Sequence, residues 1–314
     1  MAHTHPGAAP AQVHWNLDTV VEQLRLSRET THKIRHQGTI RELPSKSALV
    51  GILQGLCAVL FPTHYGRAGL TDESIDYFVG DTLNTTLSLL NEQVRRGLVF
   101  STEASGLAGP ALGERAVRIT RDFASQLPAI RALLVSDLQA AYQGDPAATS
   151  IAEILLCYPG TVAVIYYRLA HALYLLGAQL VARLISDIAH SDTGIDIHPG
   201  AQIGGSFFID HGTGVVIGQT AVIGQHVRLY QAVTLGARRF PADESGALIK
   251  GIARHPIVED DVVIYSGATI LGGDTVIGKG AVIGGNVWLI KSVPPNTTVT
   301  LSRENYTLRG NSPL

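Results

Sequence analysis

The chemically most informative feature of this sequence is a histidine with a carboxylate directly before it. Asp210 precedes His211, and another acidic residue, Asp196, lies upstream in the same glycine-rich region. A carboxylate beside an imidazole fixes the ring tautomer and stabilises the protonated ring, which is what a general base requires. These residue types predict acid–base chemistry at His211, provided that the fold brings Asp196 close to it.

The segments that must position these residues follow a six-residue period. Aliphatic residues recur in steps of six from residue 197 onward, often followed by glycine. Neither a helix nor a single strand has this period, whereas hexapeptide repeats are typical of a parallel β-helix, in which three short strands make one triangular coil. Coils stack about 4.8 Å apart, with aliphatic residues inside and small residues at the corners. The two columns are Ile197, Ile203, Ile217, Ile223, Leu229 and Leu235, then Tyr265, Leu271, Ile277, Ile283 and Leu289.

The repeat is interrupted twice, and interruptions that leave the wall of a solenoid often carry function. The first interruption adds two residues within 210–214. Because a coil of three repeats takes about 18 residues, the corner at Asp196 recurs near residue 214, just after His211. We therefore expect Asp196 and His211 to approach one another across adjacent coils. The second interruption, about 237–253, predicts a protruding loop, and the repeat restarts at Arg254-His255-Pro256.

The residues before about 190 have helical spacing instead. Apolar positions recur at three and four over 76–100, 115–142 and 162–189, and Gly144-Asp145-Pro146 ends the second stretch. The expected fold class is α+β, an all-helical N-terminal domain followed by a left-handed parallel β-helix. The predicted boundaries are 1–190 for the helical domain, with about the first 14 residues flexible, 191–299 for the β-helix and 300–314 for a C-terminal tail.

Composition and charge exclude several classes of protein. A net charge of −2 with 16% charged residues gives no nucleic-acid footprint and no polybasic membrane patch. The apolar segment 162–185 is interrupted by Arg168, His171 and Arg183, which favours a buried helix over a membrane span. Two cysteines are too few for a disulfide framework, and the N-terminus lacks a secretory pattern, so we expect a cytoplasmic protein.

Two other interpretations of the histidines remain open from the residues alone. His211 can be a corner residue that is hydrogen-bonded for structure, with Asp196 capping a turn. Alternatively, His198, His226 and His255 together with His211 would suggest a zinc-dependent hydratase. Zinc needs three or four convergent ligands, and these histidines fall in different phases of the repeat. We therefore expect no metal.

The second half of the chain resembles the bacterial serine O-acetyltransferases. The similar motifs are D-I-H-P-G-A-Q-I-G, I-D-H-G-T-G-V-V-I-G, Q-A-V-T-L-G, A-R-H-P and I-L-G-G-D-T-V-I-G, within about 145–295. The resemblance implies transfer of an acetyl group from acetyl-CoA to the hydroxyl of L-serine, the first step of cysteine biosynthesis. It implies that His211 is the general base for the serine hydroxyl and that Asp196 orients it.

The resemblance also implies how a zwitterionic amino acid is recognised. Arg254 corresponds to the carboxylate binder, since a guanidinium makes a bidentate pair with a carboxylate. His255 corresponds to a second histidine near the hydroxyl. Asp210 and Asp145 correspond to the residues that hold the ammonium group.

Acetyl-CoA, the co-substrate, lies in this family along a groove between neighbouring β-helices, where it meets backbone and small residues. One subunit then supplies only half of the groove, so the resemblance implies a homotrimer, which in relatives the helical domains join into a dimer of trimers. The small positions expected to bind the cofactor are Gly236, Ala237, Ser266, Gly267, Gly284 and Gly285.

The chain departs from the family pattern in three places. Gln219 stands where relatives usually carry glutamate, and the loop 237–253 is longer than in well-known members. The tail ends in Leu314 rather than isoleucine, so we do not expect the complex with O-acetylserine sulfhydrylase. Feedback inhibition by cysteine would be compatible with the resemblance because cysteine resembles serine.

The expected function is therefore acetyl transfer to serine, with two alternatives. One is a hexapeptide-repeat acyltransferase for another hydroxyl acceptor, either homoserine or a sugar. The other is a non-catalytic binding or assembly protein on the same scaffold. The charged residues Asp145, Asp210 and Arg254 favour an amino-acid acceptor, because a sugar needs no such charge pairing.

Overall fold

The computed structural model describes residues 15–31, 42–100, 109–239, 242–249 and 251–301. The chain divides into two compact units, residues 1–42 and residues 43–314. The first unit contains helix α1 (Leu17–Leu26), which runs into a π-helical turn (Ser27–Thr31) and buries none of its residues. The first 14 residues, which we expected to be flexible, lie outside the described residues.

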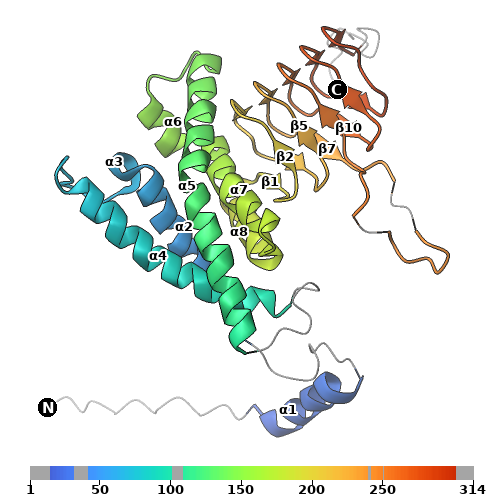
Figure 1. The fold of residues 1–314 in the computed structure, drawn as a ribbon. Coiled ribbons are helices and arrows are strands. Elements are labelled where there is room, and N and C mark those ends of the chain that lie inside the picture. The colour runs from blue at the N-terminus through green and yellow to red at the C-terminus, as the bar shows by residue number, and fades with distance from the viewer. Residues whose placement is uncertain (1–14, 32–41, 101–108, 240–241, 250, 302–314) are drawn as a thin grey trace, which may run out of the picture. The chain divides into compact units, whose positions relative to one another are not determined.

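The second unit begins with a bundle of helices (Figure 1). Helix α2 begins after Ser45, whose Oγ accepts a hydrogen bond from the Ala48 amide at 3.2 Å, and α6 begins after Ser150 in the same way, with Glu153 as the donor at 3.1 Å. The helices are α2 (Lys46–Leu60), α3 (Pro62–Tyr65), α4 (Ile75–Leu98), α5 (Pro110–Gly144), α6 (Ile151–Cys157), α7 (Pro159–Leu175) and α8 (Gln179–Thr193).

The helices confirm two of the three predicted stretches and correct the third. Helices α4 and α5 occupy the stretches predicted at 76–100 and 115–142. The stretch predicted at 162–189 is two helices, because Gly177 takes a left-handed conformation (φ 93°) between α7 and α8. In addition, α7 begins earlier than expected, with Pro159 in its first turn, where the missing N–H costs no hydrogen bond.

The β-strands form the three walls of a parallel β-helix, and the pairings between the strands of these walls are parallel throughout the described residues. Along each wall the second residue of a strand is mostly buried inside the prism, as the six-residue period predicts. Wall A contains β1 (Asp196–Ile197), β4 (Val216–Ile217), β7 (Thr234–Gly236), β10 (Thr269–Leu271) and β13 (Trp288–Leu289). Wall B contains β2 (Gln202–Ile203), β5 (Val222–Ile223), β8 (Ile257–Val258) and β11 (Val276–Ile277). Wall C contains β3 (Phe208–Ile209), β6 (Arg228–Leu229), β9 (Val263–Ile264), β12 (Val282–Ile283) and β14 (Thr298–Val299).

The second predicted column is out of register at its start. Tyr265 is 43% exposed, whereas Ile264 and Ile270 are fully buried, so the inward positions lie one residue earlier than predicted. The phase changes after Ile270, because β10 is one residue longer than most strands and Gly272 follows it at φ 110°. In the rest of the predicted column, Ile277 and Ile283 are fully buried and Leu289 is half-buried.

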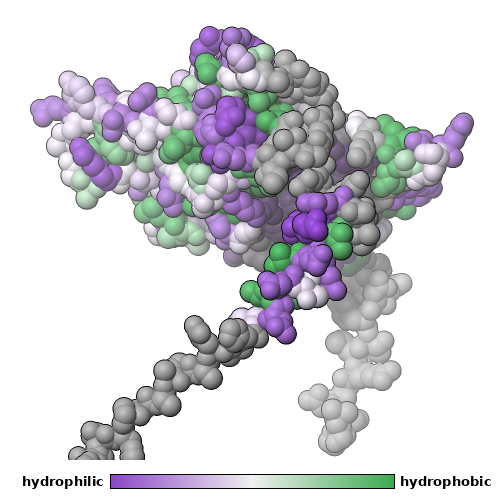
Figure 2. Space-filling model, turned by 90° about the horizontal axis from the view of Figure 1, so that it is seen from below, coloured by the Kyte–Doolittle hydropathy of each residue, from purple (hydrophilic) through white to green (hydrophobic). Residues whose placement is uncertain are grey.

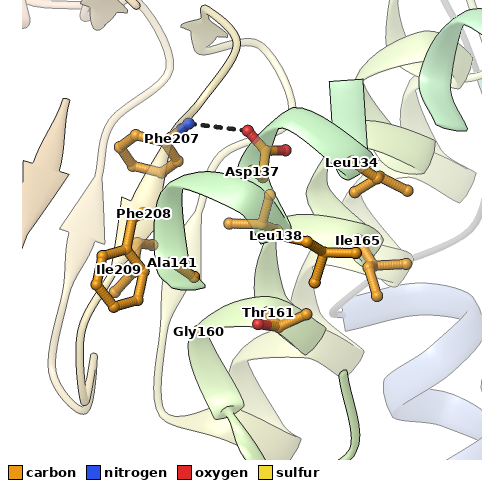
Figure 3. A pocket seen from close by; sticks show the side chains of 11 residues that line it. Leu134, Asp137, Leu138, Ala141, Gly160, Thr161, Ile165, Phe207, Phe208 and Ile209 are labelled. Carbon is orange, nitrogen blue, oxygen red and sulfur yellow. Dashed lines mark hydrogen bonds between the residues drawn. The ribbon is translucent and has the colours of Figure 1, made fainter. Parts of the chain in front are cut away.

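The helical bundle and the β-helix share a continuous core. Helices α5 and α7 contact β3, and α8 contacts β1. Arg168 on α7 donates two hydrogen bonds to Asp137 on α5, at 2.6 and 2.8 Å, and both residues are almost fully buried. Asp137 in turn accepts the Phe207 amide at 2.8 Å, as Figure 3 shows. Helices give way to strands between Thr193 and Asp196, close to the predicted boundary, but both regions belong to one compact unit.

The surface mixes polar and apolar side chains. On the face seen from below in Figure 2, hydrophilic and hydrophobic residues lie side by side. Within the described parts of the chain, no helix is both long and apolar enough to cross a membrane. The described part of the loop 237–253 contains a short antiparallel bridge between Ala242 and Leu248, and Asp243 Oδ1 accepts the Ser245 and Ala247 amides within it.

Candidate active site

The first candidate corner lies where β3 leaves wall C toward wall A. Asp210 directly follows β3 and is 8% exposed, whereas the next residue, His211, takes a left-handed conformation (φ 58°) with a side chain that is 73% exposed. The added residues of the interruption then fold against the coil below. The Gly214 amide donates to the Gly194 carbonyl at 2.8 Å, next to the start of β1.

The predicted contact between Asp196 and His211 is absent, which corrects the geometric expectation. Asp196 pairs with Val216, not with residue 214, because the two added residues lengthen this coil. Among the described residues, no hydrogen bond or ion pair joins Asp196 to His211. The carboxylate paired with the imidazole is Asp210, whose Oδ1 lies 3.9 Å from His211 Nε2.

Asp145, at the end of α5, belongs to the same corner. Its Oδ2 accepts a hydrogen bond from the Tyr158 hydroxyl at 2.5 Å, and its Oδ1 accepts the Ala147 amide at 2.8 Å. The Tyr158 hydrogen bond, above all, holds the pKa of Asp145 below its usual value, with smaller contributions from the charges of Arg228 and His211. The same hydrogen bond raises the pKa of Tyr158 to about 12. Asp145 is therefore an ionised carboxylate within electrostatic range of His211.

Arg228, on β6, joins the two carboxylate-bearing segments. It donates to Asp210 Oδ2 at 2.7 Å and to the Gly144 carbonyl, next to Asp145, at 2.5 Å. Its guanidinium lies over the rings of Phe208 and Tyr230, 5.1 and 4.7 Å from their centroids. Arg228 and Tyr158 were not predicted as site residues from the sequence, because Arg228 occupies an ordinary outward position of the repeat and Tyr158 precedes a helix.

A close approach between helix and strand fixes this corner. A Cβ atom on Gly160, in the first turn of α7, would lie 2.2 Å from the Ile209 carbonyl oxygen, so only glycine allows this packing. Figure 3 shows Gly160 and Ile209 beside the apolar side chains that α5 and α7 pack against β3. Asp210 and His211, which follow Ile209, are therefore held relative to the helices.

The second candidate corner lies between walls A and B and carries Arg254 and His255. The Arg254 Nη2 donates to Gln219 Oε1 at 2.7 Å, and Gln219 Nε2 donates to the Tyr174 hydroxyl at 3.0 Å. The Thr220 hydroxyl oxygen accepts both the Arg254 and the His255 amides, at 2.9 and 3.2 Å. These contacts attach the exit of the loop 237–253 to the coil below.

His255 is a buried, neutral imidazole. Burial, reinforced by the nearby Arg254 charge, lowers its pKa to about 4. Its Nδ1 lies 2.8 Å from the Thr220 hydroxyl and accepts the Thr220 amide at 3.2 Å, so the ring hydrogen is on Nε2. That edge of the ring packs on Gly218, where an added Cβ would lie 2.0 Å from Nε2.

The six residues expected at the cofactor groove are divided between the two corners. Gly236 and Ala237 lie at the second corner, where the loop departs from β7. Ser266, Gly267, Gly284 and Gly285 follow β9 and β12, at the same corner as His211 but in later coils. Coil packing by itself favours glycine at two of these positions. Gly267 has φ 72°, and a Cβ there would meet Asn286 Oδ1 at 2.2 Å, whereas a Cβ on Gly236 would meet Leu271 Cδ2 at 2.7 Å, a side-chain end that can move.

The structure thus places the predicted residues in two groups at different corners of one prism. One group has carboxylates and an exposed imidazole, Asp145, Asp196, Asp210 and His211. The other has a guanidinium and a neutral imidazole donor, Arg254 and His255. No group of three or more histidine, cysteine, aspartate or glutamate side chains suited to a metal occurs in the described part of the chain.

The prism of six-residue repeats, with acid–base side chains at its corners, defines the class of hexapeptide-repeat β-helix proteins. No protein-family model matches this chain. It is 56% identical over 292 residues to a plasmid-encoded serine acetyltransferase of Synechococcus elongatus, covering 91% of each chain. It is 47% identical over 163 residues to the serine acetyltransferase of Mycobacterium tuberculosis, covering 52% of this chain and 67% of that one. This chain belongs to the serine acetyltransferase family.

Solved structures support the same assignment. The crystal structure of Entamoeba histolytica serine acetyltransferase 1 in complex with L-cysteine matches with a TM-score of 0.69 at 35% identity, covering 90% of this chain and 97% of that one. The Neisseria gonorrhoeae serine acetyltransferase in complex with serine matches with a TM-score of 0.52 at 27% identity, covering 86% and 98% of the two chains.

Proposed function

We propose that this chain transfers the acetyl group of acetyl-CoA to the hydroxyl of L-serine at a site shared by two subunits. The observation that carries the proposal is the division of complementary charges between two corners of one prism. Carboxylates suited to an ammonium group are at the first corner, and a guanidinium suited to a carboxylate is at the second. One serine can reach both only if the first corner of one chain faces the second corner of another.

A homotrimer of left-handed β-helices is the assembly that we propose for this arrangement. In a closed cyclic trimer each chain presents its first corner to one neighbour and its second corner to the other, so three identical sites form. Acetyl-CoA would lie in the same seam. The small residues Ser266, Gly267, Gly284 and Gly285 would line it on one chain, and Gly236 and Ala237 on the next.

In the proposed reaction His211 is the general base. It accepts the proton of the serine hydroxyl while the serine oxygen attacks the thioester carbonyl carbon. Collapse of the tetrahedral intermediate breaks the carbon–sulfur bond, and the protonated imidazole returns the proton to the CoA sulfur. Serine is converted to O-acetyl-L-serine, and CoA is released.

Five further residues have distinct roles in this proposal. Asp145 and Asp210 bind the ammonium group, and Arg228 positions both by its bonds to Gly144 and Asp210. Arg254 binds the carboxylate. His255 is a hydrogen-bond donor through Nε2, not a second base, because its low pKa keeps it neutral and Thr220 occupies Nδ1.

Asp196 orients His211 in this proposal, and that role requires the exposed imidazole to turn toward β1. Asp196→Asn should then lower kcat with little change in the KM for serine. Asp210→Asn should mainly raise the KM for serine. The reverse pattern would assign the orienting role to Asp210, which is the carboxylate nearer to His211 in the structure.

An acceptor panel tests the function directly. CoA release from acetyl-CoA should be fastest with L-serine, slower with homoserine and at background with aminosugars. His211→Ala should reduce the rate with serine by about 10²- to 10⁴-fold, as expected for loss of a general base. Faster turnover on a sugar, or an unchanged rate in His211→Ala, would overturn the proposal.

A further inference from the structure

Three arginines surround one hollow at the base of the loop 237–253. The hollow has a volume of 210 Å³ and is lined by Arg238 and Arg239, where the loop departs, by Arg254, where it returns, and by Asp274 in the coil above. Gly272 and Gly273, which precede Asp274, also line the hollow. The hollow therefore adjoins the second corner of the proposed active site.

The charges around this hollow are poorly compensated. Arg238 and Arg239 have no hydrogen bond or ion pair with any residue that the structure describes, and Arg254 pairs with the neutral amide of Gln219. Asp274 is the one carboxylate among the lining residues, and it forms no ion pair with the arginines. Three cations against one anion leave a net charge of about +2 beside a small concave surface, which attracts an anion of more than one negative charge.

The backbone beneath the arginines leaves room for such an anion. Gly272 adopts φ 110°, and a Cβ added there would lie 3.6 Å from Arg238 Cβ and 3.1 Å from Asp274 Oδ1. A side chain at this position would therefore enter the space between Arg238 and Asp274. A guanidinium presents paired N–H groups that match the oxygens of a phosphate or of a carboxylate. The net charge of about +2 around the hollow favours the phosphate, which carries more negative charge than a carboxylate.

We infer that Arg238 and Arg239 bind a phosphate group of the acyl donor, an inference that rests on the proposed function. Because Arg254 lines the hollow and His255 follows it directly, a donor whose thioester lies at His255 has the hollow within its reach. The loop 237–253 would then contribute affinity for the phosphorylated part of CoA. The small residues near the reaction centre would contact the remainder.

The test compares the double variant Arg238→Gln/Arg239→Gln with a control that changes the charge equally, Arg118→Gln/Arg121→Gln on α5. With acetyl-CoA we expect kcat/KM to fall by about 10- to 100-fold in the loop variant, the loss of one or two charge-assisted contacts, and to stay unchanged in the control. With S-acetylpantetheine, which carries no phosphate, both variants should match the wild type. The KM for serine should be unchanged throughout.

Several results would overturn the inference. An equal loss with S-acetylpantetheine would show that the arginines act elsewhere, and a raised KM for serine would assign them to the acceptor carboxylate. Inorganic phosphate that binds the wild type without competing with acetyl-CoA would make the hollow a site for free phosphate. The affinity for CoA, measured by calorimetry, should fall in the loop variant even if serine is not the acceptor. This measurement is therefore independent of the proposed reaction.

Discussion

Replacement of Arg228 tests whether one guanidinium holds the first corner together. Arg228→Met removes the hydrogen bonds to Asp210 and Gly144 but keeps an unbranched apolar side chain beside Phe208 and Tyr230, although it is shorter than arginine. A hydrogen bond with a charged partner contributes about 1.5–3 kcal/mol, and the Asp210 side chain, 12% exposed, would lose its cation with little water to replace it. We expect the free energy of unfolding to fall by about 3 kcal/mol, since retained packing of Met offsets part of the loss.

The same change should weaken serine binding. Asp210 and the Gly144-Asp145 segment lose their common anchor, and about 1.4 kcal/mol of lost binding corresponds to a tenfold rise in the KM for serine. Arg228→Lys separates charge from geometry, because lysine keeps the charge but can reach only one of the two acceptors. We expect this variant to lie between Met and wild type in both stability and KM.

Denaturant unfolding and steady-state kinetics at saturating acetyl-CoA measure both effects. Lys279→Met is the matched control, because Lys279 is an exposed cation of the β-helix whose ammonium group, within the described part of the chain, pairs with the surface carboxylates Asp260 and Asp261. The reasoning is refuted if Arg228→Met keeps wild-type stability and KM. Wild-type stability and a wild-type KM for serine in Arg228→Lys would also refute it, because a positive charge alone would then be enough to hold the first corner.

Three other predictions concern the second corner and the core. Gly218→Ala should displace the His255 imidazole and lower kcat at least about 10-fold, whereas Gly51→Ala, with open space around its Cβ, should leave kcat unchanged. Burial lowers the pKa of His255 from 6.5 to about 4, so the folded protein favours the neutral ring. The stability that the neutral ring contributes is therefore complete above pH 6.5, and the free energy of unfolding should decline by up to about 3 kcal/mol as the pH falls toward 4. Urea unfolding at several pH values should show this decline, with a shallower slope in His255→Gln, and equal slopes would contradict it. Asp137→Asn leaves Arg168 buried without its anion, so the free energy of unfolding in the same assay should fall by about 3–5 kcal/mol. A loss below about 1 kcal/mol would contradict a structural role for this ion pair.

The sequence predicted the β-helix well because its period has one physical cause. Inward positions such as Ile217 and Leu235 must be aliphatic wherever a coil closes, so the pattern is local and repeated. The phase predicted at Tyr265 was wrong because two adjacent residues are apolar at both of these points of the repeat, Ile264 with Tyr265 and Ile270 with Leu271. Composition alone could not show which of two adjacent apolar residues faces inward.

The candidate site was harder to predict because it depends on contacts between distant segments. The interruption located His211, but the same added residues shifted the pairing of Asp196 and turned the imidazole toward solvent. Arg228 and Tyr158 gain their roles only through contacts with Gly144 and Asp145, which lie 84 and 13 residues away in the sequence. A local sequence pattern does not predict contacts between such distant segments.

Subunit complementation tests the shared site most directly. His211→Ala and Arg254→Ala should each be inactive alone, because each removes an essential side chain from one of the two corners. In trimers assembled at random from equal amounts of both variants, a site is intact when an undamaged first corner meets an undamaged second corner, so activity should recover to about a quarter of wild type. If mixed trimers, isolated through a tag on one variant, show no more activity than either parent, the two corners do not meet between chains and the central claim is contradicted.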